Sequence, residues 1–251
     1  MCLTGTESVF TGLPVKKYCL IINMCCCILS FFCVAANAKT QGTPAELKEL
    51  LGQLEKQHGG VKTLAVRFRQ EKHFSFMNKP IVSRGFIIFS SPDKIRFDIT
   101  EPFATTLLDN GKKIERYELV DGKWRRIQFN GGNSIKLVMK QIGQWMQGKF
   151  SGQKNIFALS MNIEEPNNGI FLDLEPRHKQ FRQYIEKIRV GISAGPAYNI
   201  SRIDIYEPGG DRFALDFVRK KVNQKLPEDC FSDPNSATAC EELFLKAKRK
   251  E

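Results

Sequence analysis

The sequence predicts one domain built mainly from antiparallel β-strands, with two short amphipathic helices. Long stretches alternate between apolar and polar residues, which is the period of a half-buried strand. Turn dipeptides such as Asn110-Gly111 and Asp121-Gly122 separate these stretches, and both suit the positive φ angles of two-residue hairpin turns. With 251 residues, 42% hydrophobic and 26% charged, the chain suffices for one such domain and is too apolar for a disordered protein.

The first helix is predicted to begin after Thr43, which is the N-cap. Pro44 occupies the first helical position, and Glu46 completes a capping box three residues after Thr43. Four leucines then recur at the spacing of one helix face: Leu47, Leu50, Leu51 and Leu54. Gly59-Gly60 ends this helix.

The alternation of strands begins directly after this helix. Its clearest apolar positions are Leu64, Val66, Phe68, Ile87, Phe89, Ile95, Phe97 and Ile99. Further strands are predicted over 170–174, 182–193, 198–207 and 211–220. Each of these strands has one apolar and one polar face, as expected for an antiparallel sheet with one side in water.

A second helix is predicted between the two groups of strands. Gly131 to Ser134 breaks the strand pattern and offers a cap, and Gly148 ends the helix. Its apolar positions fall on one side: Ile135, Val138, Met139, Ile142, Trp145 and Met146.

Residues 1–38 are predicted to be a secretory signal peptide, leaving 39–251 as a single domain. Lys16-Lys17 precedes an apolar run from Cys19 to Val34, and Ala36 to Ala38 has the small-x-small pattern of a cleavage site. Because the residues before the lysines are unlike a signal, we expect translation to start near Val15. An uncleaved anchor is the alternative, since the apolar run is long.

Six of the eight cysteines lie in this signal segment, so only Cys230 and Cys240 remain in the exported domain. An even pair in an exported chain is a candidate disulfide, and two unrelated thiols are the alternative. Its short loop would contribute at most about 3 kcal/mol.

No motif predicts catalysis, a metal site or a cofactor. Gly191 to Gly195 matches G-x-S-x-G around Ser193, but that motif needs a following helix and a later histidine. Pro196 and a predicted strand follow instead, and the last histidine is His178. The net charge of +11 is spread over polar strand faces, which favours steering toward acidic partners over nucleic-acid binding.

Short motifs along the chain occur in a particular order. They are Phe68-Arg69-Gln70, Pro92 to Phe97, Glu101-Pro102, Asp109 to Lys112, and Leu174-Glu175-Pro176. With the capped first helix and the mid-chain helix, this order resembles the periplasmic outer-membrane lipoprotein carrier family, LolA, over about residues 43–234.

The resemblance implies an incomplete antiparallel β-barrel, a half-barrel, whose apolar concave face is covered by a helical lid. It implies a monomeric periplasmic carrier without a cofactor. The cargo would be an acylated lipoprotein or a related lipid, received from an inner-membrane ABC-type release complex and passed to an outer-membrane acceptor lipoprotein. An envelope sensor or scaffold on the same fold, which binds a lipoprotein or protein without shuttling, is the alternative.

The resemblance also assigns site residues. The strand face expected to meet acyl chains comprises Leu64, Val66, Phe68, Ile87, Phe89, Ile95 and Phe97. The lid would contribute Val138, Met139, Ile142 and Met146. Ser91 stands where the family often has an arginine that holds the lid, and a serine hydroxyl makes fewer hydrogen bonds than a guanidinium. We therefore expect apolar contacts to supply most of the lid closure here.

Overall fold

The computed structural model describes residues 39–128, 132–164, 169–193 and 198–244, with the side chains of 39, 132–138 and 153 left out. The predicted signal peptide and the side chain of Val138 lie outside the described residues. No described helix combines the length and the apolar character needed to cross a membrane.

Twelve antiparallel strands form one open sheet in the order β1-β8-β9-β10-β11-β12-β2-β3-β4-β5-β6-β7. The strands are β1 (Lys39–Gln41), β2 (Thr63–His73), β3 (Ile81–Ser90), β4 (Lys94–Glu101), β5 (Thr105–Asp109), β6 (Ile114–Val120), β7 (Lys123–Ile127), β8 (Phe157–Glu164), β9 (Gly169–Pro176), β10 (Lys187–Ser193), β11 (Asn199–Tyr206) and β12 (Arg212–Val222). Strands β1 and β7 are the two edges, so the predicted incomplete antiparallel barrel is confirmed.

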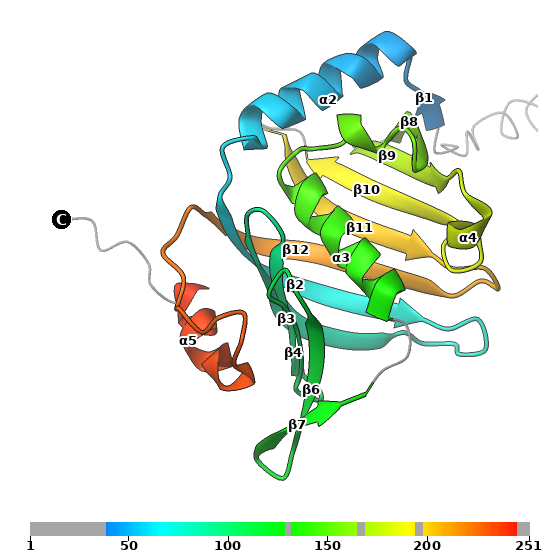
Figure 1. Ribbon diagram of the computed structural model, residues 1–251. Helices are drawn as coiled ribbons and strands as arrows, with labels where there is room; N and C mark the ends of the chain where they lie inside the picture. Colours follow the sequence, from blue (N-terminus) through cyan, green and yellow to red (C-terminus); the bar gives the residue numbers. More distant parts are fainter. Residues whose placement is uncertain (1–38, 129–131, 165–168, 194–197, 245–251) are drawn as a thin grey trace, which may run out of the picture. The chain divides into compact units, whose positions relative to one another are not determined.

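Two longer helices lie on one side of this sheet (Figure 1). They are α2 (Pro44–His58) and α3 (Gly132–Met146), and both were predicted. The capping box of α2 is present, because the Thr43 backbone N–H donates to Glu46 Oε2 at 2.7 Å and the Glu46 N–H donates to Thr43 Oγ1 at 3.3 Å. Short helices α4 (Lys179–Arg182) and α5 (Ala237–Glu241), with 3₁₀ turns at Ser151–Gln153, Pro234–Ser236 and Glu242–Phe244, complete the described elements.

The predicted Asp121-Gly122 turn is confirmed by its backbone angles, whereas at Asn110-Gly111 the glycine alone has a positive φ, 87°. Asp121 and Gly122 both have positive φ, 51° and 73°, as a tight hairpin turn between β6 and β7 requires. Gly148 follows the end of α3 with a φ of 71°. One prediction was wrong: the strand expected from residue 182 begins at Lys187, because the preceding residues form α4 and a turn.

The sheet changes direction between β3 and β4, where glycine is required. Figure 1 shows β12 and β2 running across the view while β6 and β7 run steeply downward. The pairing register shifts between Arg84 and Gly85. A side chain on Gly85 would collide with the carbonyl oxygen of Asp98 and with the Phe68 ring, so only glycine permits this close backbone approach.

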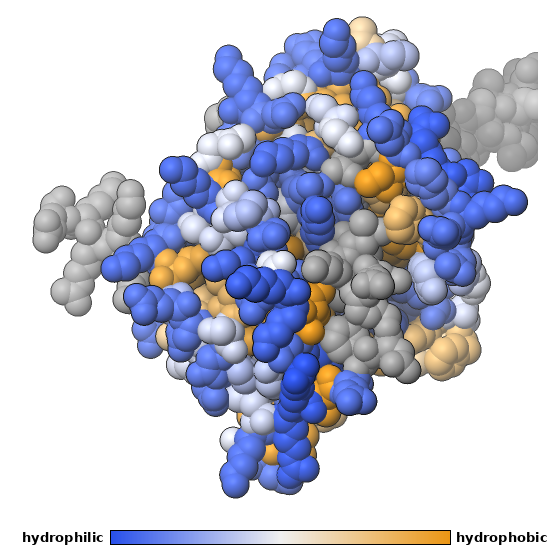
Figure 2. All heavy atoms as spheres, viewed as in Figure 1, coloured by the Kyte–Doolittle hydropathy of each residue, from blue (hydrophilic) through white to orange (hydrophobic). Residues whose placement is uncertain are grey.

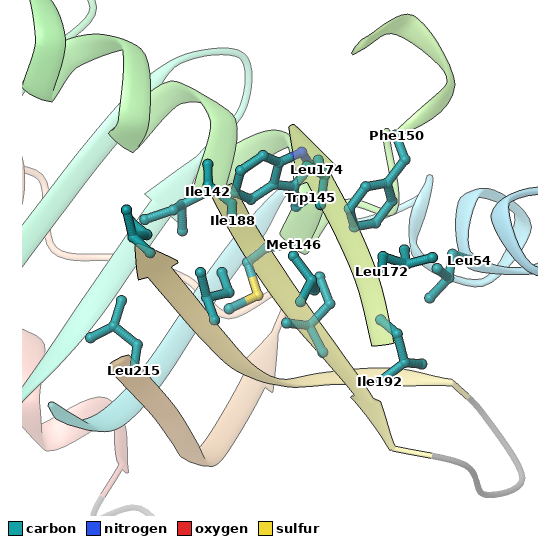
Figure 3. Packing of buried hydrophobic residues seen from close by; sticks show 14 of the residues in the cluster. Leu54, Ile142, Trp145, Met146, Phe150, Leu172, Leu174, Ile188, Ile192 and Leu215 are labelled. Atoms are coloured by element: carbon teal, nitrogen blue, oxygen red, sulfur yellow. The ribbon is translucent and has the colours of Figure 1, made fainter. Parts of the chain in front are cut away.

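The inner face of the sheet forms one apolar cluster with α2 and α3. Leu54 of α2 and Trp145 of α3 are fully buried there. Figure 3 shows Ile142, Trp145 and Met146 of α3 directed toward the side chains of the strands beneath it. Burial of such side chains contributes about 1.5–3 kcal/mol each, so these helices are held mainly by apolar contact.

The outer face of β9 to β12 carries paired charges. Arg189 donates through Nε and Nη2 to both carboxylate oxygens of Asp173, at 2.8 and 3.0 Å, and this hydrogen bonding raises the pKa of Arg189. On the next strands, Arg202 bridges Asp204 and Asp216. The charges on this face therefore neutralise one another across the strands.

The outer face of β2 to β4 is covered by the C-terminal segment, which includes α5 (Figure 1). A second apolar cluster joins Ala65, Phe86 and Ile88 of the sheet to Cys230, Phe231, Cys240 and Phe244. The two faces of the sheet are thus covered by different parts of the chain.

Arg96 of β4 binds this C-terminal segment with a fully buried guanidinium. Its Nε lies 2.5 Å from Asp98 Oδ2, and its Nη1 donates to the carbonyl oxygens of Cys230 and Asp233 at 3.0 and 2.9 Å. Nη2 donates to the carbonyl oxygen of Pro234 at 3.0 Å. One side chain therefore satisfies several backbone groups that would otherwise be buried without partners.

We predict that Arg96→Gln lowers the free energy of unfolding by about 3–5 kcal/mol, because Asp98 would keep a buried charge without its partner. Urea denaturation measures this loss. Arg84→Gln is the matched control: its ion pair with Glu101 is exposed, so its loss should be below about 1 kcal/mol. Equal losses in the two variants would contradict the account.

Cys230 and Cys240 are buried free thiols whose Sγ atoms lie 2.7 Å apart. The disulfide between them stays a prediction. We expect both thiols to become unreactive when the folded protein is oxidised. The double variant Cys230→Ser/Cys240→Ser should then be up to about 3 kcal/mol less stable than the oxidised wild-type chain. Thiol titration and unfolding with and without reductant check both parts, and an oxidised protein that keeps two reactive thiols would contradict them.

Candidate functional site

A cavity of about 940 Å³ opens on the inner side of the sheet and lies within the size range of small-molecule sites, about 300–1,000 Å³. We call it the main cavity. Its apolar lining comes from β4, β5, β11, β12, α3 and the segment after α4: Phe97, Ile99, Leu107, Met139, Ile142, Phe181, Tyr184, Ile185, Ile205, Phe213 and Leu215. Gln70, Lys72, Arg116 and Glu207 are among its polar lining residues.

Three of the predicted lipid-lining residues line the main cavity: Phe97, Met139 and Ile142. The others with described side chains belong to the same apolar cluster and are each at most 3% exposed: Leu64, Val66, Phe68, Ile87, Phe89, Ile95 and Met146. Of these, Val66 and Met146 also line a second cavity of about 530 Å³. The sequence thus placed these residues together on the inner face of the sheet, and the lipid-binding role of the set stays a prediction. The sequence did not distinguish the inner-face residues that are closely packed from those that line the main cavity.

The lining residues that were not predicted from the sequence fall into two groups. Ile99, Phe213 and Leu215 continue alternations that were already visible in the sequence, so extending the inner-face set along each strand would have included them. Phe181, Tyr184 and Ile185 lie in and after α4, which was predicted as strand. A strand pattern places alternate residues on opposite faces, so it could not bring these three together.

The two cationic side chains at the main cavity already have partners. The Lys72 ammonium lies 4.7 Å from the centre of the Phe74 ring, and Arg116 pairs with Glu118 at 2.7 Å. These groups add polar atoms to a lining that is otherwise mostly apolar. Such an arrangement suits a ligand with an apolar chain inside and a polar end toward water.

Exposed apolar side chains lie at the same end of the sheet as the main cavity. Phe76 is in the β2–β3 loop and is 79% exposed, and Phe103 is in the β4–β5 turn and is 81% exposed. The pairing of Lys72 with Ile81 and of Arg84 with Glu101 places both connections at one end of the strands. Figure 2 shows a viewed face that is mostly hydrophilic, with hydrophobic residues in small patches between polar ones.

Helix α3 covers the packed part of the inner face. The Trp145 ring stacks on Phe150 with ring centres 6.2 Å apart and meets Phe157 edge-on at 6.2 Å. Gly143 lies against the Phe89 ring, where an added Cβ would approach to 3.0 Å. The helix is therefore closely packed at its C-terminal half, while Met139 and Ile142 meet the main cavity.

Two polar atoms of α3 are buried without a hydrogen-bond partner among the described residues. They are Trp145 Nε1 and Gln141 Oε1. Leaving such a group without a partner costs about 1–3 kcal/mol, because it gives up its hydrogen bonds to water. Burial of these two groups therefore offsets part of the stabilisation that the apolar contacts of α3 provide.

Ser91 lies exposed at the turn between β3 and β4. Its backbone N–H donates to the carbonyl oxygen of Lys62 at 2.8 Å, and its hydroxyl makes no hydrogen bond to a described residue. The gating role of Ser91 stays a prediction. The contacts of α3 that are described are predominantly apolar.

The described residues offer no assembled metal site or nucleophile–base pair. No group of three or more His, Cys, Asp or Glu side chains among them could hold a metal ion. Ser193 Oγ donates to the carbonyl oxygen of Asn199 at 3.2 Å, and His58 Nε2 lies 2.7 Å from the carbonyl oxygen of Tyr198. Both groups thus bond to backbone rather than to each other.

We predict that Gln141→Met stabilises the closed position of α3 by about 1–2 kcal/mol, since it replaces an unpartnered buried amide by an apolar chain of similar length. Uptake of a lipophilic dye, followed by stopped-flow fluorescence, should slow by about five- to thirtyfold. Lys140→Met is the control, because Lys140 is the exposed neighbour on the same helix. Equal rates in Gln141→Met and the wild-type protein would contradict a lid limited by these contacts.

Several solved structures are similar in fold. A LolA superfamily protein from Nitrosomonas europaea is 13% identical, with 75% of this chain and 98% of that chain covered and a TM-score of 0.41. The lipoprotein LppX of Mycobacterium tuberculosis is 9% identical, with 74% and 99% covered and a TM-score of 0.43. The MucA/MucB complex of Pseudomonas aeruginosa matches at 16% identity, with 76% and 62% covered and a TM-score of 0.35.

Comparison with known protein sequences identifies the family of this chain. An outer-membrane lipoprotein carrier protein of Dechloromonas aromatica (strain RCB) is 24% identical over 173 residues, which are 68% of this chain and 76% of that protein. Residues 59–233 match the family described as outer membrane lipoprotein carrier protein LolA. This match spans the strands and the α3 helix that build the main cavity, and the chain therefore belongs to the LolA family.

Proposed function

We propose that this protein holds the acyl chains of a lipoprotein, or of a related lipid, in the main cavity and carries them from the inner to the outer membrane. The observation that carries the proposal is an apolar cavity of about 940 Å³ bordered by a helix with two unpartnered buried polar atoms. The role is one of binding and transfer, without covalent chemistry.

Reversible binding is the physical requirement for such a carrier. Burial of an acyl chain is worth about 0.8 kcal/mol per methylene, so one long chain exceeds about 10 kcal/mol. A carrier must release its cargo, and closure of α3 over the empty inner face competes with the ligand. Met139 and Ile142 support this competition, because they belong both to the apolar cluster and to the lining of the main cavity.

The partners in this proposal follow from the family. They are an acylated cargo, an inner-membrane ABC-type release complex and an outer-membrane acceptor lipoprotein. We place the protein in the periplasm, as a monomer, after removal of residues 1–38. The exposed side chains of Phe76 and Phe103 at the end of the sheet that holds the main cavity would face the membrane or the partner during transfer.

A second candidate is an envelope sensor or scaffold that binds a lipoprotein or protein partner without shuttling. One observation favours it: part of the predicted lipid-binding face is filled by the protein's own side chains, including Trp145 at 0% exposure. The two functions differ in transfer, because only a carrier accepts an acylated ligand from one membrane and releases it to another.

The test compares variants that fill or charge the main cavity. Leu107→Trp puts a large ring into the cavity, and Ile142→Glu puts a carboxylate on its apolar wall. Both should weaken binding of a fluorescent triacylated lipopeptide at least tenfold. Leu119→Trp is the matched control, because Leu119 lies on β6 with 43% of its surface exposed and does not line the cavity.

Release of a lipoprotein from spheroplasts by the purified protein then separates the two candidates. A carrier releases the lipoprotein in a complex, and Leu107→Trp abolishes this release. Lipopeptide binding without any release identifies a sensor or scaffold. If Leu107→Trp and Ile142→Glu bind lipopeptide as tightly as the control, the main cavity is not the cargo site.

A further inference from the structure

The sheet divides at the end remote from the main cavity. Pairing between β11 and β12 ends at Arg202 and Asp216. Beyond that point β11 continues to Asn199 along β10, whereas β12 continues to Val222 along β2. A register shift in β12 next to Phe217 accompanies the separation. Between the diverging strands lies a second cavity of about 530 Å³, which we call the cleft.

The cleft has apolar walls and reaches the main apolar cluster. Val66 of β2, Met146 of α3 and Ile200 of β11 line it and also belong to that cluster. Val61, Phe217, Val218 and Val222 add further apolar surface. The cleft is thus within the size range of small-molecule sites, and apolar residues make up half of its lining.

One ammonium group faces this apolar cleft. Lys220 pairs with Val66 in the register of β12 and β2, so its side chain lies on the same inner face as Val66. Its Nζ donates to Asn199 Oδ1 at 3.2 Å, and it forms no ion pair with any described carboxylate. None of the lining residues is acidic. Partial burial lowers the pKa of Lys220, because the ammonium loses hydrating water.

The other basic side chains at the cleft hydrogen-bond to backbone carbonyl oxygens. His58 Nε2 donates to the Tyr198 carbonyl oxygen at 2.7 Å, and burial lowers the pKa of His58. Arg219 donates from Nη1 to the carbonyl oxygen of Phe244 at 3.1 Å. Lys220 is therefore the cationic group in the cleft that is bonded only to a neutral side-chain amide.

We propose that the cleft binds an anionic amphiphile, with its carboxylate or phosphate group on Lys220 and its apolar chain along Val66, Ile200 and Phe217. A half-buried cation is stabilised by an anion, and apolar walls beside it favour an anion that carries a hydrocarbon chain. This site is separate from the main cavity and goes beyond the proposed carrier function.

The test uses dodecanoate, the neutral dodecanol and inorganic phosphate as probes in calorimetric titrations of the full domain. Lys220→Gln keeps a donor toward Asn199 but removes the charge. It should weaken dodecanoate about ten- to hundredfold, the worth of a charged hydrogen bond, and leave dodecanol unchanged. Lys220→Arg should restore dodecanoate binding. Lys225→Gln is the control, because Lys225 is exposed beyond the end of β12.

A diazirine-labelled dodecanoate then locates the bound chain by mass spectrometry of cross-linked peptides. Labels on peptides that contain Val66 or Ile200, retained in Leu107→Trp, support the cleft whether or not the main cavity carries lipoproteins. Labels confined to the main cavity, or equal dodecanoate affinity in Lys220→Gln and Lys225→Gln, would overturn the proposal. Binding of phosphate as tight as that of dodecanoate would also overturn it, because the apolar chain would then contribute nothing.

Discussion

An open sheet of twelve strands has an apolar inner face that water would reach unless other parts of the chain covered it. In this protein α2 and α3 provide the cover, and the arrangement of the site depends on how completely they do so. The C-terminal half of α3 packs closely around Trp145, whereas Met139 and Ile142 border open space. Under the proposed function, cargo binding and self-closure use the same apolar surface, and cargo enters more readily the more easily α3 separates from the sheet.

The two faces of the sheet are held by different kinds of interaction. On the outer face, Arg96 fixes the C-terminal segment through charged and backbone hydrogen bonds in a buried setting. On the inner face, α3 has apolar contacts and two buried polar atoms without described partners. Directional hydrogen bonds hold one geometry, while apolar contacts permit sliding and separation at lower cost. The outer face can thus remain fixed while the inner cover moves.

Local sequence patterns determined most of the fold, because period, caps and turn residues act within a few positions. The Thr43 capping box, the Asp121-Gly122 turn and the alternation around Phe68 each correspond to the structure. The open cavity could not be located in this way, since an inner-face residue is equally apolar whether α3 packs on it or not. Helix α4 was not predicted, because a single helical turn is too short to show a periodic pattern of apolar residues. The lining residues Phe181 and Tyr184, which lie in and after this helix, were therefore not predicted either. The cleft depends on where β11 and β12 separate, which is a property of strand pairing rather than of either strand.

The central claim is that α3 moves from the sheet when an acylated ligand occupies the inner face. Spin labels on Lys140 of α3 and Glu175 of β9 test it most directly, because both positions are exposed and the native Cys230 and Cys240 are buried. Distances between the labels should be measured by pulsed electron paramagnetic resonance with and without a triacylated lipopeptide. The account predicts a shift to longer distances with bound lipopeptide. An unchanged distance distribution in the protein that co-elutes with lipopeptide would contradict it.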